Sequence, residues 1–519
     1  MRQLLLDVQA TPSVELAVVE VAARPRRRRP SVFRAYEWLD RRLFASEPDA
    51  LEPVPIGLSL ERVDAPRTKE LDRSLASFLE SYKPDVVINL GSVANELVAP
   101  KTRLGAWWLS MRAPELPHGG PIAFDELLRG TVVGTALLAV KASGESVVLQ
   151  KSYTAVDRVS LQRTRNRLLW RSMRCVPRSL AAVQAQGPAY LDRSRLSTVT
   201  QTTAAEPPAH VVIGHVLRTA AGIGRRRLRR LLYRDQWFVA IRRRAPSDVA
   251  KRIAGDAPTN DFAPILTLRG AYFADPFLFE HAGTTHLFVE RFSYGERRGS
   301  IWCCALDGEG RPGPLIPVVV SESHVSYPFV FTSEDRIYLL TEAEEGRRVP
   351  LYEAADFPAE WREHPPLLQN IDAVDPTLVE KDGLFWLFVN SGLNGDAFDD
   401  ELHLFFAETL AGAWHSHPLN PIVSDVRRAR PAGRIFELDG TLVRPSQDCA
   451  EAYGHAVVFN RIDVMTPTAY SEMVIGRMDP TWSEALAGTH TYGFDSRFEV
   501  VDGIRPYRRF PWRNRSKVA

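Results

Sequence analysis

The sequence predicts a multidomain protein in which an α/β domain precedes an all-β propeller of five blades. The chain has 519 residues, which is too long for one ordinary domain. Helical and strand patterns alternate in its first third, and short strands separated by turn residues fill its second half. We place the α/β domain at residues 1–184, a linker with a basic helix at 185–235, the propeller at 236–510 and a basic tail at 511–519.

The first third alternates short apolar strands with amphipathic helices. Residues 14–21 and 86–90 are apolar runs typical of buried strands, and residues 69–82 have helical periodicity. Residues 31–44 carry Phe33, Tyr36, Leu39 and Leu43 at helical spacing. This alternation predicts an α/β domain with a parallel sheet. The linker that follows is rich in Ala, Pro, Thr and Arg, and we expect its helix at residues 224–233.

One hairpin pattern recurs four times in the second half, with a period of about fifty residues that fits a four-stranded blade. The units begin at Asp275, Tyr327, Asp375 and Ala432, and fifteen residues later they end at Glu290, Glu342, Asn390 and Gln447. A β-sandwich is the alternative, but it would not repeat one hairpin at a fixed register. A fifth unit is expected at residues 489–491 and 498–501, with an early strand at 236–241 or residues 455–460 as its outer strands. Closure by an early strand would remove exposed sheet edges.

Composition limits the functions that we consider. Net charge is +2, so the whole molecule has no strong field that would favour nucleic acid. Dense arginine clusters at residues 24–29, 225–230 and 242–244 are either solvated faces or contacts for acidic lipid or a phosphorylated ligand. The four cysteines form no C-x-x-C pair, so we expect reduced, buried thiols and no metal site or cofactor. We expect neither a signal peptide nor a membrane span, and a cytoplasmic protein that is at most membrane-peripheral.

The start of each innermost strand should open on one mouth of the central channel. That position brings together Asp275, Tyr327, Asp375, the segment from Arg430 to Arg434, and His490. The ends of the second strands should form a nearby polar ring of Glu290, Glu342, Asn390 and Gln447. Buried carboxylates are costly unless they are paired or functional, so these registers indicate a site. The alternative is that Asp275 and Asp375 only cap turns before proline.

The openings at Asp275 and Asp375 resemble those of five-bladed arabinanase, β-xylosidase and invertase-type glycoside hydrolases. In those families two such carboxylates act with a glutamate of a later blade, which is the general acid. Here the corresponding segment runs from Arg430 to Arg434 and contains no glutamate. If the chemistry is hydrolysis, Glu342 or Glu290 would have to supply the acid.

A narrower resemblance covers about residues 236–505. Residues 424–433, 444–449 and 488–491 are similar to the N-terminal domain of plant glucosamine inositolphosphorylceramide transferases. Bacterial relatives of that domain often follow a formyltransferase-like domain, and residues 84–153 resemble that fold in the order of their elements. Active formyltransferases carry an Asn-x-His pair, where this chain has Trp108 and Ser110. We therefore expect a degenerate domain without formyl transfer.

These observations predict an enzyme of surface-glycan or glycolipid metabolism, glycosyltransferase- or glycosidase-like, with a sugar bound in the propeller mouth. We assign catalysis to Asp275, Glu342 and Asp375. We assign substrate binding to Glu290, Tyr327, Asn390, Arg430, Arg434, Arg444, Gln447, Asp448 and His490. The arginines would neutralise a phosphate or carboxylate on the substrate. Alanine at Arg430 or Arg434 should then weaken ligand binding and leave stability nearly unchanged. The alternatives are a non-catalytic carbohydrate-binding protein, a glycoside hydrolase and a protein–protein scaffold.

Overall fold

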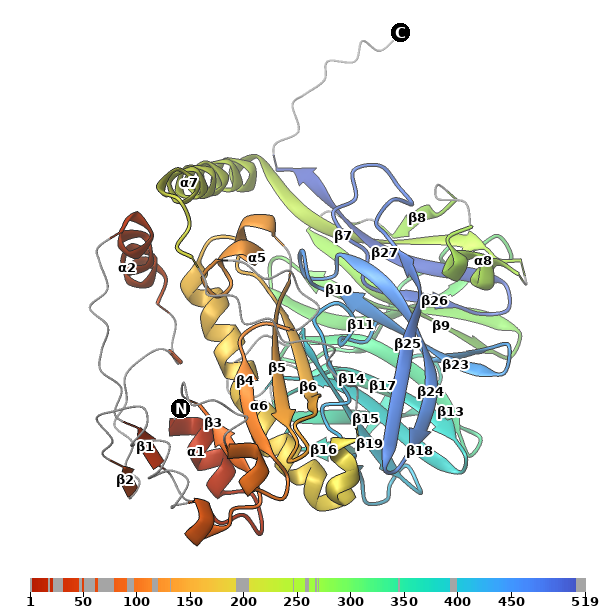
Figure 1. Cartoon of the computed structure of the whole chain (residues 1–519). Coiled ribbons are helices and arrows are strands. Elements are labelled where there is room, and N and C mark those ends of the chain that lie inside the picture. The colour runs from red at the N-terminus through yellow and green to blue at the C-terminus, as the bar shows by residue number, and fades with distance from the viewer. Residues whose placement is uncertain are drawn as a thin grey trace. The chain divides into compact units, whose positions relative to one another are not determined.

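The computed structural model describes residues 2–16, 19–21, 31–45, 49–50, 61–63, 79–90, 98–113, 120–130, 132–192, 205–245, 247–256, 261–266, 268, 270–343, 346–392 and 399–509. The chain divides into two compact units, Met1–Gly222 and Ile223–Ala519 (Figure 1). Among the described helices, none is long and apolar enough to cross a membrane. The arginine cluster at 24–29 and the basic tail lie outside the described residues.

A four-stranded mixed sheet forms the centre of the first unit. Its order is β3 (Val87–Asn89), β4 (Ala106–Ser110), β5 (Val132–Val140) and β6 (Ser146–Ala155). Only β3 and β4 run parallel, and the other neighbours are antiparallel. The predicted parallel sheet is therefore wrong here. A short turn, closed by Lys141 N–H donating to Glu145 O at 2.8 Å, joins β5 to β6, whereas parallel strands need a long crossover.

Helices complete this α/β unit. They are α1 (Arg2–Gln9), α2 (Val32–Phe44), α5 (Phe124–Arg129), α6 (Leu161–Gln186) and the 3₁₀ turns η1 (Ala99–Lys101) and η2 (Gly187–Leu191), with a parallel pair β1 (Val19–Val21) and β2 (Glu61–Val63). The predicted helix at 31–44 is confirmed, and Ser31 caps it by accepting a hydrogen bond from Arg34 N. The strand expected at 86–90 is β3. Of the helix expected at 69–82, only residues 79–82 are described, and they are helical.

The described parts of the predicted linker, residues 185–192 and 205–235, are more ordered than their composition indicated. Helix α7 spans Ala209–Leu232, far longer than the expected 224–233, and strand β7 (Tyr233–Arg243) follows it directly. Its first half is anchored because Val212 and His215, three residues apart, lie on one buried face. The resemblance of the first unit to formyltransferases stays a prediction.

Five antiparallel sheets make up the second unit, and we call them blades 1 to 5. Blade 1 contains β9 (Ala271–His281), β10 (Thr284–Ser293), β11 (Arg298–Leu306) and β12 (Ile316–Val319), and blade 2 contains β13 (Val325–Ser333), β14 (Arg336–Ala343), β15 (Arg348–Asp356) and β16 (Glu360–Gln369). Blade 3 contains β17 (Ala373–Lys381), β18 (Leu384–Ser391), β19 (Glu401–Ala407), β20 (His415–Ser416) and β21 (Val423–Ser424), and blade 4 contains β22 (Phe436–Leu438), β23 (Thr441–Asp448), β24 (Ala456–Thr466) and β25 (Ala469–Met478). Blade 5 contains β26 (Tyr492–Phe494), β27 (Phe498–Arg508), β7 and β8 (Ala263–Leu266), with α8 (Asp248–Ala254) between its last two strands.

Blade 5 joins the two ends of the second unit. Strand β7 pairs with β27 along its full length, with Tyr233 opposite Arg508 and Arg243 opposite Phe498. The predicted closure by an early strand is therefore confirmed. Its physical effect is to pair a strand edge that would otherwise be open. The pairing begins at Tyr233, three residues before the predicted boundary at 236.

Clusters of buried side chains join each blade to the next. One cluster holds Phe288, Leu339 and Leu387 of blades 1 to 3, a second holds Trp386 and Ile462 of blades 3 and 4, a third holds Phe459 and Phe238 of blades 4 and 5, and a fourth holds Val239 and Leu287 of blades 5 and 1. Burial of this apolar surface is the main stabilising contribution between blades. The five sheets thus follow one another around a propeller-like ring (Figure 1).

The cysteines lie inside these clusters or other buried regions. All four cysteines are buried, as the sequence predicted, and no disulfide joins any two of them. Cys303 packs in the cluster shared by blades 1 to 3, and Cys304 packs in the cluster shared by blades 5 and 1. The adjacent pair therefore points to opposite faces of β11, as the two-residue period of a strand requires.

Candidate functional site

The innermost strands of blades 1 to 3 share one backbone irregularity. Asp275, Tyr327 and Asp375 each precede a proline and have a positive φ, of 49°, 54° and 52°. The register of the strand pair shifts beside each of them. A non-glycine residue pays about 1–2 kcal/mol for left-handed backbone, and such strain persists where the surrounding structure holds it in place. The fifteen-residue repeat therefore marks one bulge in the innermost strand of each of blades 1 to 3.

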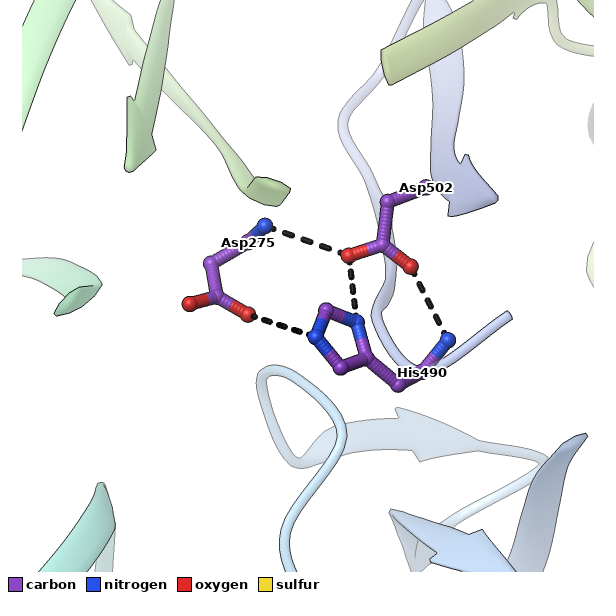
Figure 2. Close-up of side chains that lie close together, drawn as sticks. All are labelled: Asp275, His490 and Asp502. Carbon is purple, nitrogen blue, oxygen red and sulfur yellow. Dashed lines mark hydrogen bonds and ion pairs between the residues drawn. The ribbon is translucent and has the colours of Figure 1, made fainter. Parts of the chain in front are cut away.

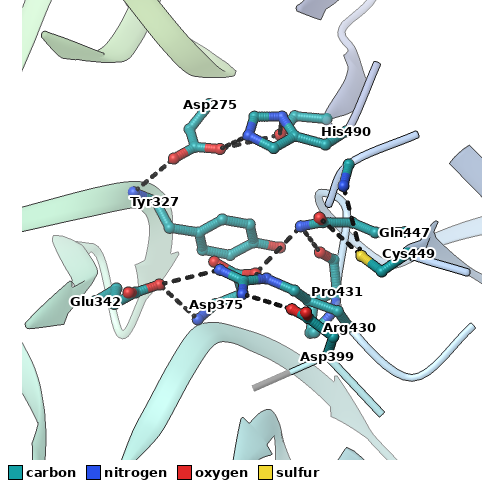
Figure 3. Close-up of polar contacts among 12 residues, drawn as sticks. Asp275, Tyr327, Glu342, Asp375, Asp399, Arg430, Pro431, Gln447, Cys449 and His490 are labelled. Carbon is teal, nitrogen blue, oxygen red and sulfur yellow. Dashed lines mark hydrogen bonds and ion pairs between the residues drawn. The ribbon is translucent and has the colours of Figure 1, made fainter. Parts of the chain in front are cut away.

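A carboxylate from the preceding blade binds the amide of each of these residues. Asp275 N–H donates to Asp502 Oδ2 at 3.1 Å, Tyr327 N–H donates to Asp275 Oδ2 at 3.2 Å, and Asp375 N–H donates to Glu342 Oε2 at 3.3 Å. Figure 3 shows the last two of these bonds. The bulges leave these amides without a strand partner, and the carboxylates satisfy them. These carboxylates therefore connect neighbouring blades by hydrogen bonds. The sequence-based alternative, in which Asp275 and Asp375 only cap turns, did not include this role.

His490 lies between two aspartates (Figure 2). Its Nδ1 is 2.5 Å from Asp502 Oδ2, and its Nε2 is 3.7 Å from Asp275 Oδ1. The ring stacks on Trp237 with centroids 3.9 Å apart, and Thr491 Oγ1 donates to Asp275 Oδ1 at 3.1 Å. Asp502 thus fixes the orientation of the imidazole and directs its other nitrogen toward Asp275.

Burial and charge have opposite effects on the proton affinities of this pair. Burial would lower the pKa of His490, but the carboxylates of Asp502, Asp275 and Asp375 outweigh it and raise the pKa overall. Burial raises the pKa of Asp275 to about 6, against the opposing effect of His490. The raised pKa of Asp275 and the imidazole beside it make these two side chains a candidate pair for proton transfer.

Asp275, His490 and Asp502 also meet the distance requirement for a metal site, since their ligand atoms lie within 4.8 Å of one another. However, Asp502 already accepts hydrogen bonds from the amides of Asp275, His490 and Thr491. Its oxygens are also engaged by the imidazole. These bonds fit a hydrogen-bonded acid–imidazole pair better than an open ligand set, and the absence of a metal stays a prediction.

Arg430 joins three carboxylates on the other side of the centre (Figure 3). Its Nε donates to Asp375 Oδ2 at 2.6 Å, one terminal nitrogen is 3.2 Å from Asp399 Oδ1, and the other is 3.8 Å from Glu342 Oε2. Its side chain is only 10% exposed. The expectation that Arg430 waits in a solvated mouth is therefore wrong. The sequence could not show this, because Asp399 follows a segment outside the repeat.

Glu342 and Glu290 are buried carboxyl groups whose pKa values the site raises. Burial raises the pKa of Glu342 well above its ordinary value, Asp375 raises it further, and Arg430 only partly offsets these effects. Burial also raises the pKa of Glu290, with Asp275 and Glu342 as the next causes. The sites of this acidic cluster cannot all ionise together, so some carboxyl groups stay neutral and can donate protons.

Two predicted polar residues carry buried atoms without hydrogen-bond partners in the described structure. They are Oε1 of Glu290 and both amide atoms of Asn390. Asn390 is 0% exposed, so its unsatisfied amide is energetically costly. Buried unsatisfied groups in a native protein indicate a water or ligand that completes them.

The aromatic and amide residues of the mouth have defined partners. Tyr327 OH lies 2.8 Å from Thr377 Oγ1 and accepts from Gly433 N at 2.9 Å, so it links blades 2, 3 and 4. Gln447 Nε2 donates to Asp375 Oδ2 at 3.2 Å and to Pro431 O at 2.9 Å. Both residues hold Asp375 and its neighbours in place.

Three further residues that we predicted to bind substrate form contacts with other protein groups instead. Arg444 is fully buried and pairs with Glu472, at 2.7 Å for the shorter contact. Arg434 donates to the Val330 carbonyl and covers the Phe329 ring at 4.7 Å. Asp448 pairs with Arg477. The surroundings of these side chains correct the sequence-based picture, because each side chain already has at least one polar partner in the protein.

Several residues of the centre were missed from sequence. Asp502, Asp399 and Trp237 fall outside the repeated positions. Tyr453 is 47% exposed and packs on His490 with ring centroids 5.5 Å apart and on Arg430 at 4.8 Å. An exposed aromatic beside a polar cluster is a suitable surface for a sugar ring, whose C–H groups are apolar. The only available signal was the position of Tyr453 in the loop between β23 and β24.

The fold and the site together define a propeller-like domain with an acidic centre that holds one histidine and one arginine. Residues 255–485 match the family model described as the N-terminal domain of glucosamine inositolphosphorylceramide transferase 1. The predicted resemblance to that domain is therefore confirmed for this segment.

Curated relatives carry the same description. Glucosamine inositolphosphorylceramide transferase 1 of Oryza sativa subsp. japonica is 33% identical over 208 residues, which are 39% of this chain and 28% of that protein. The Arabidopsis thaliana protein is 32% identical over 208 residues, which are 27% of its length. The chain thus matches less than a third of the length of these relatives.

Solved structures of glycoside hydrolases are distantly similar. An exo-β-1,3-galactanase from Clostridium thermocellum is 14% identical with a TM-score of 0.33, and the match covers 41% of this chain and 53% of that one. A family 43 β-xylosidase/α-arabinofuranosidase from a compost microbial metagenome is 12% identical with a TM-score of 0.33, over 46% and 92% of the two chains.

Proposed function

We propose that the propeller-like domain binds a sugar of a glycolipid or surface glycan at its centre and acts on it by acid–base chemistry. The observation that carries this proposal is the meeting of carboxyl groups from different blades, on strained backbone, with raised pKa values. Strained backbone and perturbed pKa values both cluster at functional sites. The matched relatives, named as glucosamine inositolphosphorylceramide transferases, support a phosphorylated glycolipid as the substrate class.

Each acid has a distinct role in this proposal. Glu342, whose pKa burial raises, donates a proton to the leaving oxygen. Asp275, with a pKa of about 6 and an imidazole 3.7 Å away, accepts a proton from the attacking hydroxyl. Asp375, bound by Arg430 and Gln447, orients these groups and further raises the pKa of Glu342. Tyr453 provides a stacking surface for the sugar.

The second candidate is a carbohydrate-binding protein without catalysis. It is favoured by the observation that the same acids form hydrogen bonds that hold the blades together. Asp275 and Glu342 each bind the backbone amide of the next blade. These two carboxylates would be needed for the ring even if no reaction took place. Turnover separates the two candidates.

The test uses the full chain with an inositolphosphoryl glycolipid, nucleotide sugars and glucosamine-containing oligosaccharides, with products identified by mass spectrometry. E342Q and D275N preserve the shape of each side chain and one acceptor oxygen but lose the proton chemistry. D382N, on the exposed turn between β17 and β18, is the control because its side chain is 78% exposed. Loss of product in E342Q and D275N alone would support the proposal. Saturable binding without product would favour the binding protein, and equal activity in all three variants would refute the assigned roles.

A further inference from the structure

The second half of α7 exposes an apolar stripe that no other described element covers. Leu228, Leu231 and Leu232 are 58%, 67% and 49% exposed. Their spacing of three and four residues places them on one face of the helix. Single exposed leucines are ordinary on protein surfaces, but three on adjacent turns of one helix indicate an interaction surface.

Arginines flank this stripe on both sides. Five of the six residues from Arg225 to Arg230 are arginine, and all five are exposed. Arg229 pairs with Asp235 at 2.6 Å. The other four have no carboxylate partner among the described residues. Arg508 and Arg509, at the end of β27, are also exposed and continue the basic surface next to the helix.

Strand β27 relates this surface to the site. It runs from Phe498 through Asp502, which holds His490, to Arg508, which pairs with Tyr233 directly after α7 (Figure 1). Arg509 N–H donates to the Leu232 carbonyl at 2.9 Å. Six residues of strand separate Asp502 from Arg508, a distance of about 20 Å. Strand β27 therefore leads from the site at Asp502 to the end of blade 5 that adjoins the basic helix α7.

We propose that the α7 surface, made of residues 225–232, Arg508 and Arg509, docks on a bilayer that carries anionic lipids. A helix of arginines around a leucine stripe fits the boundary between headgroups and acyl chains, where the charges meet lipid phosphates and the leucines enter the apolar layer. This inference goes beyond the proposed function and does not depend on it. A membrane dock on this side of the domain would bring the centre within reach of a lipid-linked sugar.

Two other occupants fit the surface less well. A nucleic acid would neutralise the arginines but would leave the three leucines without an apolar partner. A second copy in a two-fold contact would cover the leucines but would bring ten arginines together, at a large electrostatic cost.

The test measures co-sedimentation of the full chain with vesicles of neutral lipid, and of neutral lipid with phosphatidylserine, with no glycolipid present. We expect binding only to the anionic vesicles and weaker binding at higher salt. The triple variant R225Q/R226Q/R227Q should lower the affinity by about a hundredfold, about fivefold for each charge. L228S/L231S should lower it at least tenfold and leave the salt dependence in place.

Matched controls come from exposed positions elsewhere on the second unit. R311Q/R336Q/R347Q removes three charges whose side chains are 77%, 61% and 57% exposed. V320S/V474S removes two apolar groups that are 62% and 48% exposed. Circular dichroism should show that all four variants fold.

The proposal would be overturned by absent binding, by equal binding to neutral vesicles, or by equal losses in test and control variants. It would also be overturned by tighter binding to RNA at equal phosphate concentration. Self-association without lipid that L228S/L231S abolishes would assign the surface to a second copy instead.

Discussion

Replacing Arg430 tests whether ion pairs hold the centre together. The variant is Arg430→Met, which keeps the volume of the side chain and removes the charge. Arg430 is 2.6 Å from Asp375 and 3.2 Å from Asp399, and the Asp375 side chain is 4% exposed. Without the guanidinium, at least one buried carboxylate stays uncompensated.

The expected loss follows from this burial. Breaking a buried ion pair by removing one partner costs about 3–5 kcal/mol. The matched control is Arg336→Met, whose side chain is 61% exposed and pairs with Glu353 at 3.2 Å. An exposed pair of this kind contributes about 0–1 kcal/mol. The two arginine variants should therefore differ by at least about 2 kcal/mol in the free energy of unfolding.

Urea unfolding of the full chain, followed by circular dichroism, measures this difference. Urea is preferred because guanidinium chloride screens the ion pairs under study. The double variant R430M/D375N should lose less stability than the sum of its single variants, since the neutral amide that replaces the Asp375 carboxylate leaves no charge unpaired there. A loss below about 1 kcal/mol for R430M with an unchanged m-value, or additive losses in the cycle, would refute the reasoning.

Three further predictions address protonation, backbone geometry and the first unit. Because burial raises the pKa of Asp275 from 3.8 to about 6, the folded state holds its proton more tightly, and this group should lower stability as pH rises from about 4 to 6. Asp275→Asn should remove that slope, at most ~3 kcal/mol, in urea unfolding at pH 4 and pH 7. Gly433→Ala should cost more stability than Gly440→Ala, because at φ 129° its Cβ would lie 2.2 Å from the Tyr492 carbonyl oxygen, whereas Gly440 faces open space; comparable midpoints would contradict this. The first unit, with Trp108 and Ser110 in place of the donor-handling pair, should transfer no formyl group from a tetrahydrofolate donor, and any formylated amino sugar detected by mass spectrometry would disprove this.

The sequence predicted the repeat and the inward-turned positions because these are local features of the chain. A hairpin with a fixed spacing from Asp275 to Glu290 sets its own register, and a proline after Asp275 marks the bulge. The same logic recovered the helix at 31–44, whose apolar spacing and serine cap lie within a few turns. The sequence-based prediction was wrong for the sheet of the first unit, because a short turn makes β5 and β6 antiparallel. It also underestimated the length of α7, because a composition typical of a linker covers residues that form a helix.

Tertiary structure alone decided the partners and the protons of the site. Asp502 is 227 residues from Asp275, yet it binds the amide of that residue and orients His490. From the sequence we predicted that Arg430 binds an anionic ligand. In the folded protein it is buried instead among the carboxylates of Glu342, Asp375 and Asp399. A pKa depends on burial and on the charges within a few ångströms, and these distances exist only after all five blades have closed around one centre.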